Sequence, residues 1–154
     1  MPGLFDMGSA EAMFEHLKNK WVNFNENPSE ESLIDTLFPM YHLREWIYRG
    51  GCRDGKDKTG DKRRRIRDFN KRLWDLPEYL IIKSLCNHTK HYKCDPDKNP
   101  EHSMTKVRGA IVGLMRCNDS LDQLYFLVDG RDIREIFNEV YRAYYEFFND
   151  DVGD

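Results

Sequence analysis

The chain has 154 residues, of which 40% are hydrophobic and 33% charged, and its formal net charge is −3. A chain of this length fits one domain, and its composition is that of a soluble globular protein with a sizeable core. No apolar run reaches the roughly 20 residues that a membrane-spanning helix needs, so we expect no membrane partner. The four cysteines are scattered and no export signal is recognisable, which favours free thiols and a cytoplasmic location.

The N-terminal part of the chain is predicted to form two helices. Ser9 precedes a run to about Phe24 whose apolar residues recur at helical spacing, so we expect Ser9 to cap the first helix. Asn27, followed by Pro28 and Glu30, has the pattern of a helix start with a cap, a first-turn proline and an acid three residues on. We therefore expect a second helix to begin there.

The second helix is predicted to run to about Tyr48, although Pro39 lies inside it. Proline lacks a backbone donor and clashes with the preceding turn, so we expect a kink or break between Asp35 and Pro39. The glycine-rich residues from about 50 to 61 read as a flexible surface loop, and a basic helix follows to about residue 73.

The C-terminal part combines helices with a strand pair. A fourth helix is predicted from about Pro77 to Lys93, a β-hairpin over about residues 106–128, and an amphipathic helix over about 132–149 that begins at Asp132. Together the elements predict a mainly α fold, an up-and-down bundle of four to five helices with a β-hairpin before the C-terminal helix. We expect one domain over residues 1–154.

The basic helix is a candidate nucleic-acid-binding segment. Residues 53–72 hold ten Lys or Arg against four Asp, so the net charge of the remaining chain is strongly negative. Such a segment can attract a phosphate backbone, because neutralising phosphates releases condensed counterions. The candidate residues are Lys62, Arg63, Arg64, Arg65 and Arg67. The alternative is that these side chains form the solvated face of an amphipathic helix.

The stretch "SLCNHTKHYKC" at residues 84–94 is rich in polar and reactive side chains. At 100° per residue, His88 shares the apolar stripe that starts at Ile81, so we expect it to be a core histidine with a satisfied partner. Asn87 and His91 form a polar ridge beside that stripe, flanked by Lys83 and Lys90.

A second polar group is predicted in "MYHLREW", on the second helix. Glu45 falls on the apolar stripe of that helix, where an unpaired carboxylate would cost several kcal/mol. We expect it to pair with His91, Lys90 or Asn87 across the helix interface. The predicted cluster consists of His42, Glu45, Trp46 and Lys90, with His91 in reach of the first three.

The combination of "YHLREW" on one helix and "LCNHTKH" on a later one resembles small bacterial helical proteins of the HEPN-like type, over residues 10–94. HEPN ribonucleases place an arginine, four to six residues and then a histidine on one helix. This chain has Lys83, four residues and then His88. By this resemblance His88 or His91 would act in metal-independent RNA cleavage, with Lys83 in place of the arginine and Asn87 beside the histidine.

Three functions remain open on these observations. The first is a non-catalytic HEPN-like module that binds RNA, a nucleotide or a protein partner, or forms a homodimer through an exposed aromatic patch, because the chain has nine Phe, eight Tyr and three Trp. The second is the HEPN-type endoribonuclease. The third is a structural zinc protein using Cys86, His88, His91 or Cys94, but these side chains diverge around one helix, so we expect no metal and no cofactor.

Overall fold

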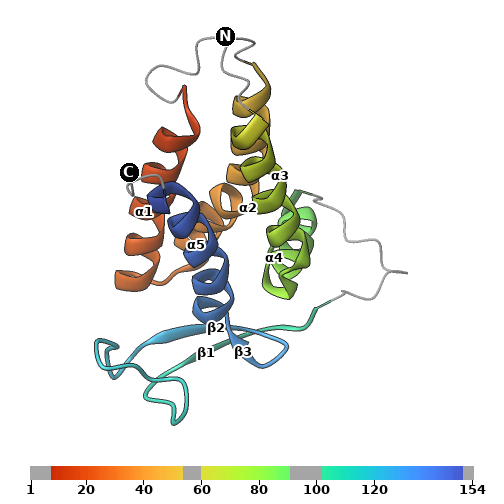
Figure 1. The fold of residues 1–154 in the computed structure, drawn as a ribbon. Helices are drawn as coiled ribbons and strands as arrows, with labels where there is room; N and C mark the ends of the chain where they lie inside the picture. The colour runs from red at the N-terminus through yellow and green to blue at the C-terminus, as the bar shows by residue number, and fades with distance from the viewer. Residues whose placement is uncertain (1–7, 54–59, 91–101, 151–154) are drawn as a thin grey trace.

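The computed structural model describes residues 8–53, 60–90 and 102–150 (Figure 1). Within these ranges the helices are α1 (Ala10–Glu26), α2 (Glu30–Arg53), α3 (Gly60–Asp75), α4 (Pro77–Lys90) and α5 (Ile133–Asn149). The strands are β1 (Met104–Arg108), β2 (Leu124–Val128) and β3 (Arg131–Asp132). The predicted fold class is confirmed: the chain is mainly helical, with a small antiparallel sheet before the C-terminal helix.

The core lies between the apolar faces of the helices, and α5 contributes the most regular of them. Its buried residues recur every three or four positions and include Ile136, Phe137, Val140 and Tyr144, as its periodicity predicts. The Tyr144 hydroxyl donates a hydrogen bond of 2.9 Å to the carbonyl oxygen of Met40 in α2. This bond satisfies a phenol that is fully buried in the core. None of the helices in the described ranges is both long and apolar enough to cross a bilayer.

The junction between α1 and α2 differs from its prediction. Ser9 caps α1 as expected, since its side chain accepts a hydrogen bond from the Ala12 N–H. Asn27, however, ends α1 instead of starting α2, and its N–H donates to the Asn23 carbonyl. Ser29 takes the capping role for α2: the Ser29 and Ser32 side chains each accept a hydrogen bond from the other's backbone N–H.

The expected kink or break in α2 is not a break, because the helix runs through Pro39 without interruption, and the kink stays a prediction. A proline removes a single backbone donor, so only one helical hydrogen bond is lost. Met40 and Leu43, which follow it, are completely buried in the core. Packing of this face holds the helix across the proline.

The sheet lies at one end of the bundle, beneath α5 (Figure 1). Its strand order is β1-β2-β3, all antiparallel, with Lys106 opposite Phe126 in the first pair. Much of the β-hairpin predicted over about residues 106–128 is not strand: β1 ends at Arg108, and residues 109–123 form a loop. Gly109 and Gly113 adopt φ angles of 124° and 87°, which a strand residue with a side chain rarely takes.

A buried ion-pair cluster fixes this loop to the start of α5. Arg134 is 4% exposed and donates to Asp119 Oδ1 at 2.7 Å and to Asp132 Oδ2 at 2.9 Å. Asp119 also accepts hydrogen bonds from the Arg116 N–H and the Tyr125 hydroxyl. Asp132 in turn caps α5 by accepting from the Arg134 N–H, as predicted. The 109–123 loop is therefore held in place by charge-assisted bonds rather than by strand pairing.

Candidate functional site

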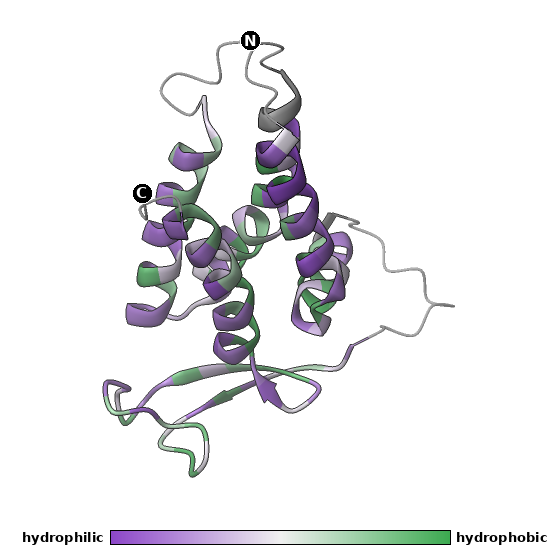
Figure 2. Ribbon diagram, in the orientation of Figure 1, coloured by the Kyte–Doolittle hydropathy of each residue, from purple (hydrophilic) through white to green (hydrophobic). Residues whose placement is uncertain are grey.

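Helix α3 carries the strongest concentration of positive charge in the described chain. It packs on the bundle through Ile66, Phe69 and Leu73, which are spaced three and four residues apart. Figure 2 shows α3 as a largely hydrophilic helix on the side of the bundle. At 100° per residue, Arg63, Arg67, Lys71 and Arg64 fall within one arc about 100° wide on the face away from this apolar contact.

These cations have no partner within the described residues. Lys62, Arg63, Arg64, Arg67 and Lys71, here called the basic strip, are all exposed. None of them makes a side-chain hydrogen bond or an ion pair in the part of the chain that the structure describes. The strip is therefore an array of solvent-facing positive charges that no carboxylate of the described residues contacts, although Asp68 and Asp75 lie on the same helix.

Arg65, one of the five predicted nucleic-acid residues, does not belong to the strip. Its guanidinium carbon lies 4.6 Å from the centroid of the Phe147 ring in α5, and its guanidinium also donates to the Phe147 carbonyl. Arg65 is half-buried by these contacts. It joins α3 to α5, and the expectation that it faces water is wrong.

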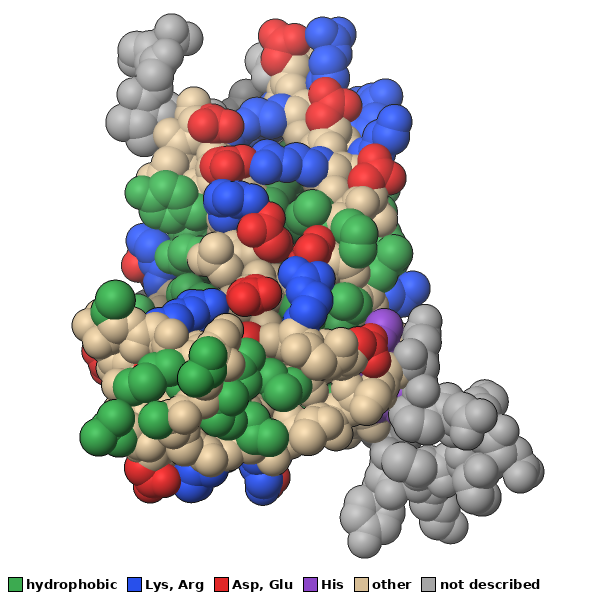
Figure 3. All heavy atoms as spheres, turned by 90° about the horizontal axis from the view of Figure 1, so that it is seen from below, with side chains coloured by type: hydrophobic (Ala, Val, Ile, Leu, Met, Phe, Trp, Pro, Cys, Tyr) green, Lys and Arg blue, Asp and Glu red, His purple; other side chains and the backbone are tan. Residues whose placement is uncertain are grey.

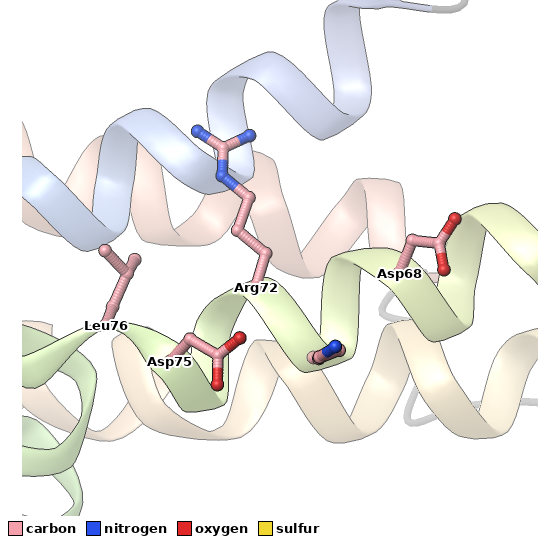
Figure 4. Close-up of a pocket in the computed structure, with 5 residues that line it drawn as sticks. Asp68, Arg72, Asp75 and Leu76 are labelled. Carbon is pink, nitrogen blue, oxygen red and sulfur yellow. The ribbon is translucent and has the colours of Figure 1, made fainter.

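A shallow depression lies beside α3 (Figure 4). It is lined by Asp68, Lys71, Arg72, Asp75 and Leu76. Arg72 points from α3 towards α5, where it pairs with Glu146. With Arg72 neutralised in this way, two carboxylates oppose one free lysine. The depression therefore does not favour an anionic ligand.

A polar cluster does join α2, α3 and α4, but it is centred on Arg44. The Arg44 guanidinium donates from Nε to the Tyr79 hydroxyl at 2.9 Å and from Nη1 to Asn70 Oδ1 at 2.8 Å. The Tyr79 hydroxyl donates in turn to the Tyr41 carbonyl at 3.1 Å. Burial raises the pKa of Tyr79 to about 12, against the opposing effect of Arg44, so Tyr79 is a neutral phenol at neutral pH. Arg44 additionally lies over the ring of Trp74.

The predicted cluster around Glu45 is arranged differently. His42 Nδ1 lies 3.8 Å from Glu45 Oε2, and the two side chains are 32% and 42% exposed. Trp46 is half-buried. Glu45 is not buried because the core face of α2 is formed by Met40, Leu43 and Ile47, on the opposite side of the helix. The side chain of Lys90 and the whole of His91 lie outside the described residues, so their predicted contacts with this group stay predictions.

On α4, the prediction for His88 is wrong. The buried apolar residues are Tyr79, Ile82, Leu85 and Cys86, with Ser84 also buried, and this apolar face is turned by about 100° from the predicted stripe. His88 and Asn87 are consequently exposed. Lys83 is half-buried, with Nζ 4.8 Å from the centroid of the Trp74 ring. Lys83 and His88 stand about 140° apart around α4, so their side chains diverge.

Metal-binding side chains do not converge within the described ranges, where no three His, Cys, Asp or Glu side chains are placed to hold an ion. Cys86 is buried and Cys117 exposed, and neither forms a disulfide with a described residue. Cys94 and His91, the other candidate ligands, lie outside these ranges.

The sheet end of the molecule presents an apolar surface. Four exposed side chains, here called the apolar face, come from β1 and the 109–123 loop: Met104, Val112, Met115 and Leu121. Figure 3 shows hydrophobic side chains gathered in one patch on this side. The expected aromatic patch is not present among the described residues in that form: only Tyr48 and Tyr145 are exposed large aromatics, and the remaining rings pack into or against the core.

Comparison of the chain with protein-family models, with curated proteins and with solved structures finds no match in any of the three. The HEPN-like assignment is therefore neither supported nor contradicted by a relative. The functional interpretation depends on the geometry of the chain itself.

Sequence reasoning missed Arg44, Asn70 and Trp74. Trp74 had a usable signal, because at 100° per residue it lies on the same arc of the basic helix as Arg63 and Arg67. Arg44 stands inside the quoted "YHLREW" stretch, but its contacts reach residues 26 and 35 positions later in the chain. Such distant pairing leaves no periodic trace in a single sequence.

Proposed function

We propose that this protein is a non-catalytic module that binds single-stranded RNA or a similar polyanion through the basic strip of α3. The observation that carries the proposal is the absence of any acidic partner for the five strip cations within the described residues. Although the net charge of the chain is −3, these five cations lie on one helix. RNA backbone phosphates that contact them would release their condensed counterions, which favours binding. The HEPN-like relationship and a cytoplasmic location are part of this proposal.

A binding role is favoured over catalysis by the arrangement of α4. Proton transfer to or from an RNA 2′-hydroxyl needs a base and a nearby cation that converge on one phosphate. Lys83 points to Trp74 while His88 faces solvent elsewhere on the helix. The ribonuclease alternative would therefore depend on His91.

Charge reversal on the strip tests the proposal. The variant Arg63→Glu, Arg64→Glu, Arg67→Glu keeps the buried face of α3 intact and should abolish binding of a fluorescein-labelled single-stranded RNA, measured by anisotropy at low salt. A matched control reverses three exposed arginines outside α3, Arg108, Arg116 and Arg142, and should retain binding. Equal loss in both variants would show that only net charge matters, and wild-type protein without RNA affinity would reject the proposal.

The apolar face supports a second function, self-association. Val112 and Leu121 are fully or largely exposed, on a loop that the buried Arg134 cluster holds in place. A fixed apolar surface of this kind is typical of a protein interface. We propose that two copies pair through it, which light scattering coupled to size exclusion would show as a dimer. The variant Val112→Glu, Leu121→Glu should then be a monomer, and a monomeric wild type would reject this second function.

A further inference from the structure

Trp74 carries two cations on its ring. The Arg44 guanidinium carbon lies 4.9 Å from the ring centroid, and Lys83 Nζ lies 4.8 Å from it. The three residues come from α2, α3 and α4, so the fold brings them together from distant parts of the chain. Each contact is a cation–π interaction, which is favourable by itself.

The groups that contact these two cations within the described chain are neutral. Arg44 is held by two neutral groups, the Tyr79 hydroxyl and the side-chain amide oxygen of Asn70. No carboxylate of the described residues forms an ion pair with Arg44 or with Lys83. The acid nearest in α2, Glu45, pairs with His42, and Asp75, next to Trp74 in α3, is exposed and makes no ion pair there. Two half-buried cations therefore lie on one ring without a carboxylate in direct contact among the described residues, and the negative charge that acts here is the more distant one of Glu45.

We infer that Arg44 and Lys83 bind a phosphate group beside Trp74. A guanidinium that is already oriented by two hydrogen bonds suits phosphate, and a lysine adds a point charge. Trp74 continues the arc of Arg63 and Arg67 on α3, so a strand lying on the basic strip leads to this place. Where the phosphate belongs to an RNA strand, the inference rests on the proposed function. The same chemistry would also accept a free phosphate or a mononucleotide.

A purely structural role accounts for the position of Arg44 but not for the charge of Lys83. Arg44 joins α2 to α3 and α4 through its hydrogen bonds, and such networks occur in many helical cores. Lys83 makes no hydrogen bond or ion pair within the described residues, and its stem could cover Trp74 equally well without a charge. Replacing the Lys83 ammonium group therefore separates the two readings.

The test uses full-length protein labelled with ¹⁵N, in which the indole N–H signal of Trp74 is assigned by its loss in Trp74→Phe. Inorganic phosphate, adenosine monophosphate and a single-stranded RNA are titrated separately. Saturable movement of the Trp74 signal with at least one of them supports the site. Movement with the small phosphates identifies a free-phosphate site, and movement with RNA alone identifies a backbone contact. No movement with any probe overturns the inference.

Lys83→Met should lose the movement of the Trp74 signal, and its RNA affinity should become less salt-dependent by about 0.7 in the log–log slope, the value for one lost phosphate contact on a single strand. Lys18→Met is the matched control, since Lys18 also lies over an aromatic ring, that of Phe14 in α1. It should change neither readout. If Lys83→Met behaves like the control while the strip variant loses RNA, the phosphate site is wrong and the proposed function stands. If the small phosphates shift the Trp74 indole signal but RNA does not bind, the phosphate site is supported and the proposed function is wrong.

Discussion

Arg134 is the central residue of the buried ion-pair cluster at the loop end of the molecule. Its guanidinium is buried between Asp119 and Asp132, whose side chains are 6% and 3% exposed. Arg134→Met would leave two buried carboxylates without a counter-charge, so we expect the free energy of unfolding to fall by about 3–5 kcal/mol. Urea denaturation measures it. Arg142→Met, on an exposed position of the same helix, should stay within about 0.5 kcal/mol of wild type, and a similar small loss at Arg134 would contradict this account.

The same cluster predicts a pH dependence through Asp119. Burial by itself would raise the pKa of Asp119, but hydrogen bonds from Arg134, the Arg116 N–H and Tyr125 outweigh it, so the pKa lies below its ordinary value. A lowered carboxyl pKa adds stability above the unfolded-state pKa, and that stability is lost as the pH falls through the folded-state pKa.

Thermal unfolding of wild type and Asp119→Asn across pH 2–7 measures this effect. The variant should be clearly less stable at pH 7, and the gap should close at pH values below the ordinary carboxyl range, about 4. A gap that stays constant down to pH 2 would show that Asp119 acts by shape and not by charge.

Predictions for single residues succeeded where the residue's role depends on its neighbours in sequence, and failed where it depends on tertiary packing. Ser9 and Asp132 were predicted as helix caps because a cap bonds within three residues of itself. His88 and Glu45 were misplaced because the angular position of a residue on a helix predicts its burial only when the direction of the core is known. A short apolar run is compatible with more than one such direction. For α4 and α2 that direction is set by distant partners, including the Tyr79 bond to Arg44.

At the scale of elements, the start of α2 offers a direct comparison. Ser29 forms the reciprocal pair of hydrogen bonds with Ser32, whereas Asn27 ends α1. Ser29→Ala should therefore lower the free energy of unfolding by about 1 kcal/mol, the usual effect of losing an N-cap. Asn27→Ala should have less effect. The reverse order, measured by urea denaturation, would restore the capping role that the sequence pattern assigns to Asn27.

The helices were predictable in existence and order, and the strand region only in part. Helix α5 has an uninterrupted 3.6-residue periodicity that no competing structure explains. Residues 109–117 are apolar enough to read as a strand, yet they form a loop. What holds them is the bond from Arg134 to Asp119, a tertiary contact between residues 15 positions apart, together with two glycines at positive φ.

For the whole molecule, charge and hydrophobicity are separated on different surfaces. The basic strip lies on α3 at one side of the bundle, and the apolar face lies on the sheet end. The basic segment was visible in the sequence as a local excess of charge. Its division into free cations and the half-buried Arg65 was not, because that division depends on where α5 places Phe147.

The salt dependence of RNA binding tests the central claim most directly. The slope of log affinity against log salt should be no steeper than about −3.5 for wild type, the value for five phosphate contacts, because Lys62 lies about 100° outside the arc of the other four cations. It should become shallower by about 2.1 in Arg63→Gln, Arg64→Gln, Arg67→Gln, at about 0.7 per contact on a single strand. The Gln variant keeps polar side chains without their charge and leaves two strip cations, so residual binding remains measurable. Equal slopes for the two proteins, or no wild-type affinity at low salt, would contradict the assignment of α3 as the RNA-binding surface.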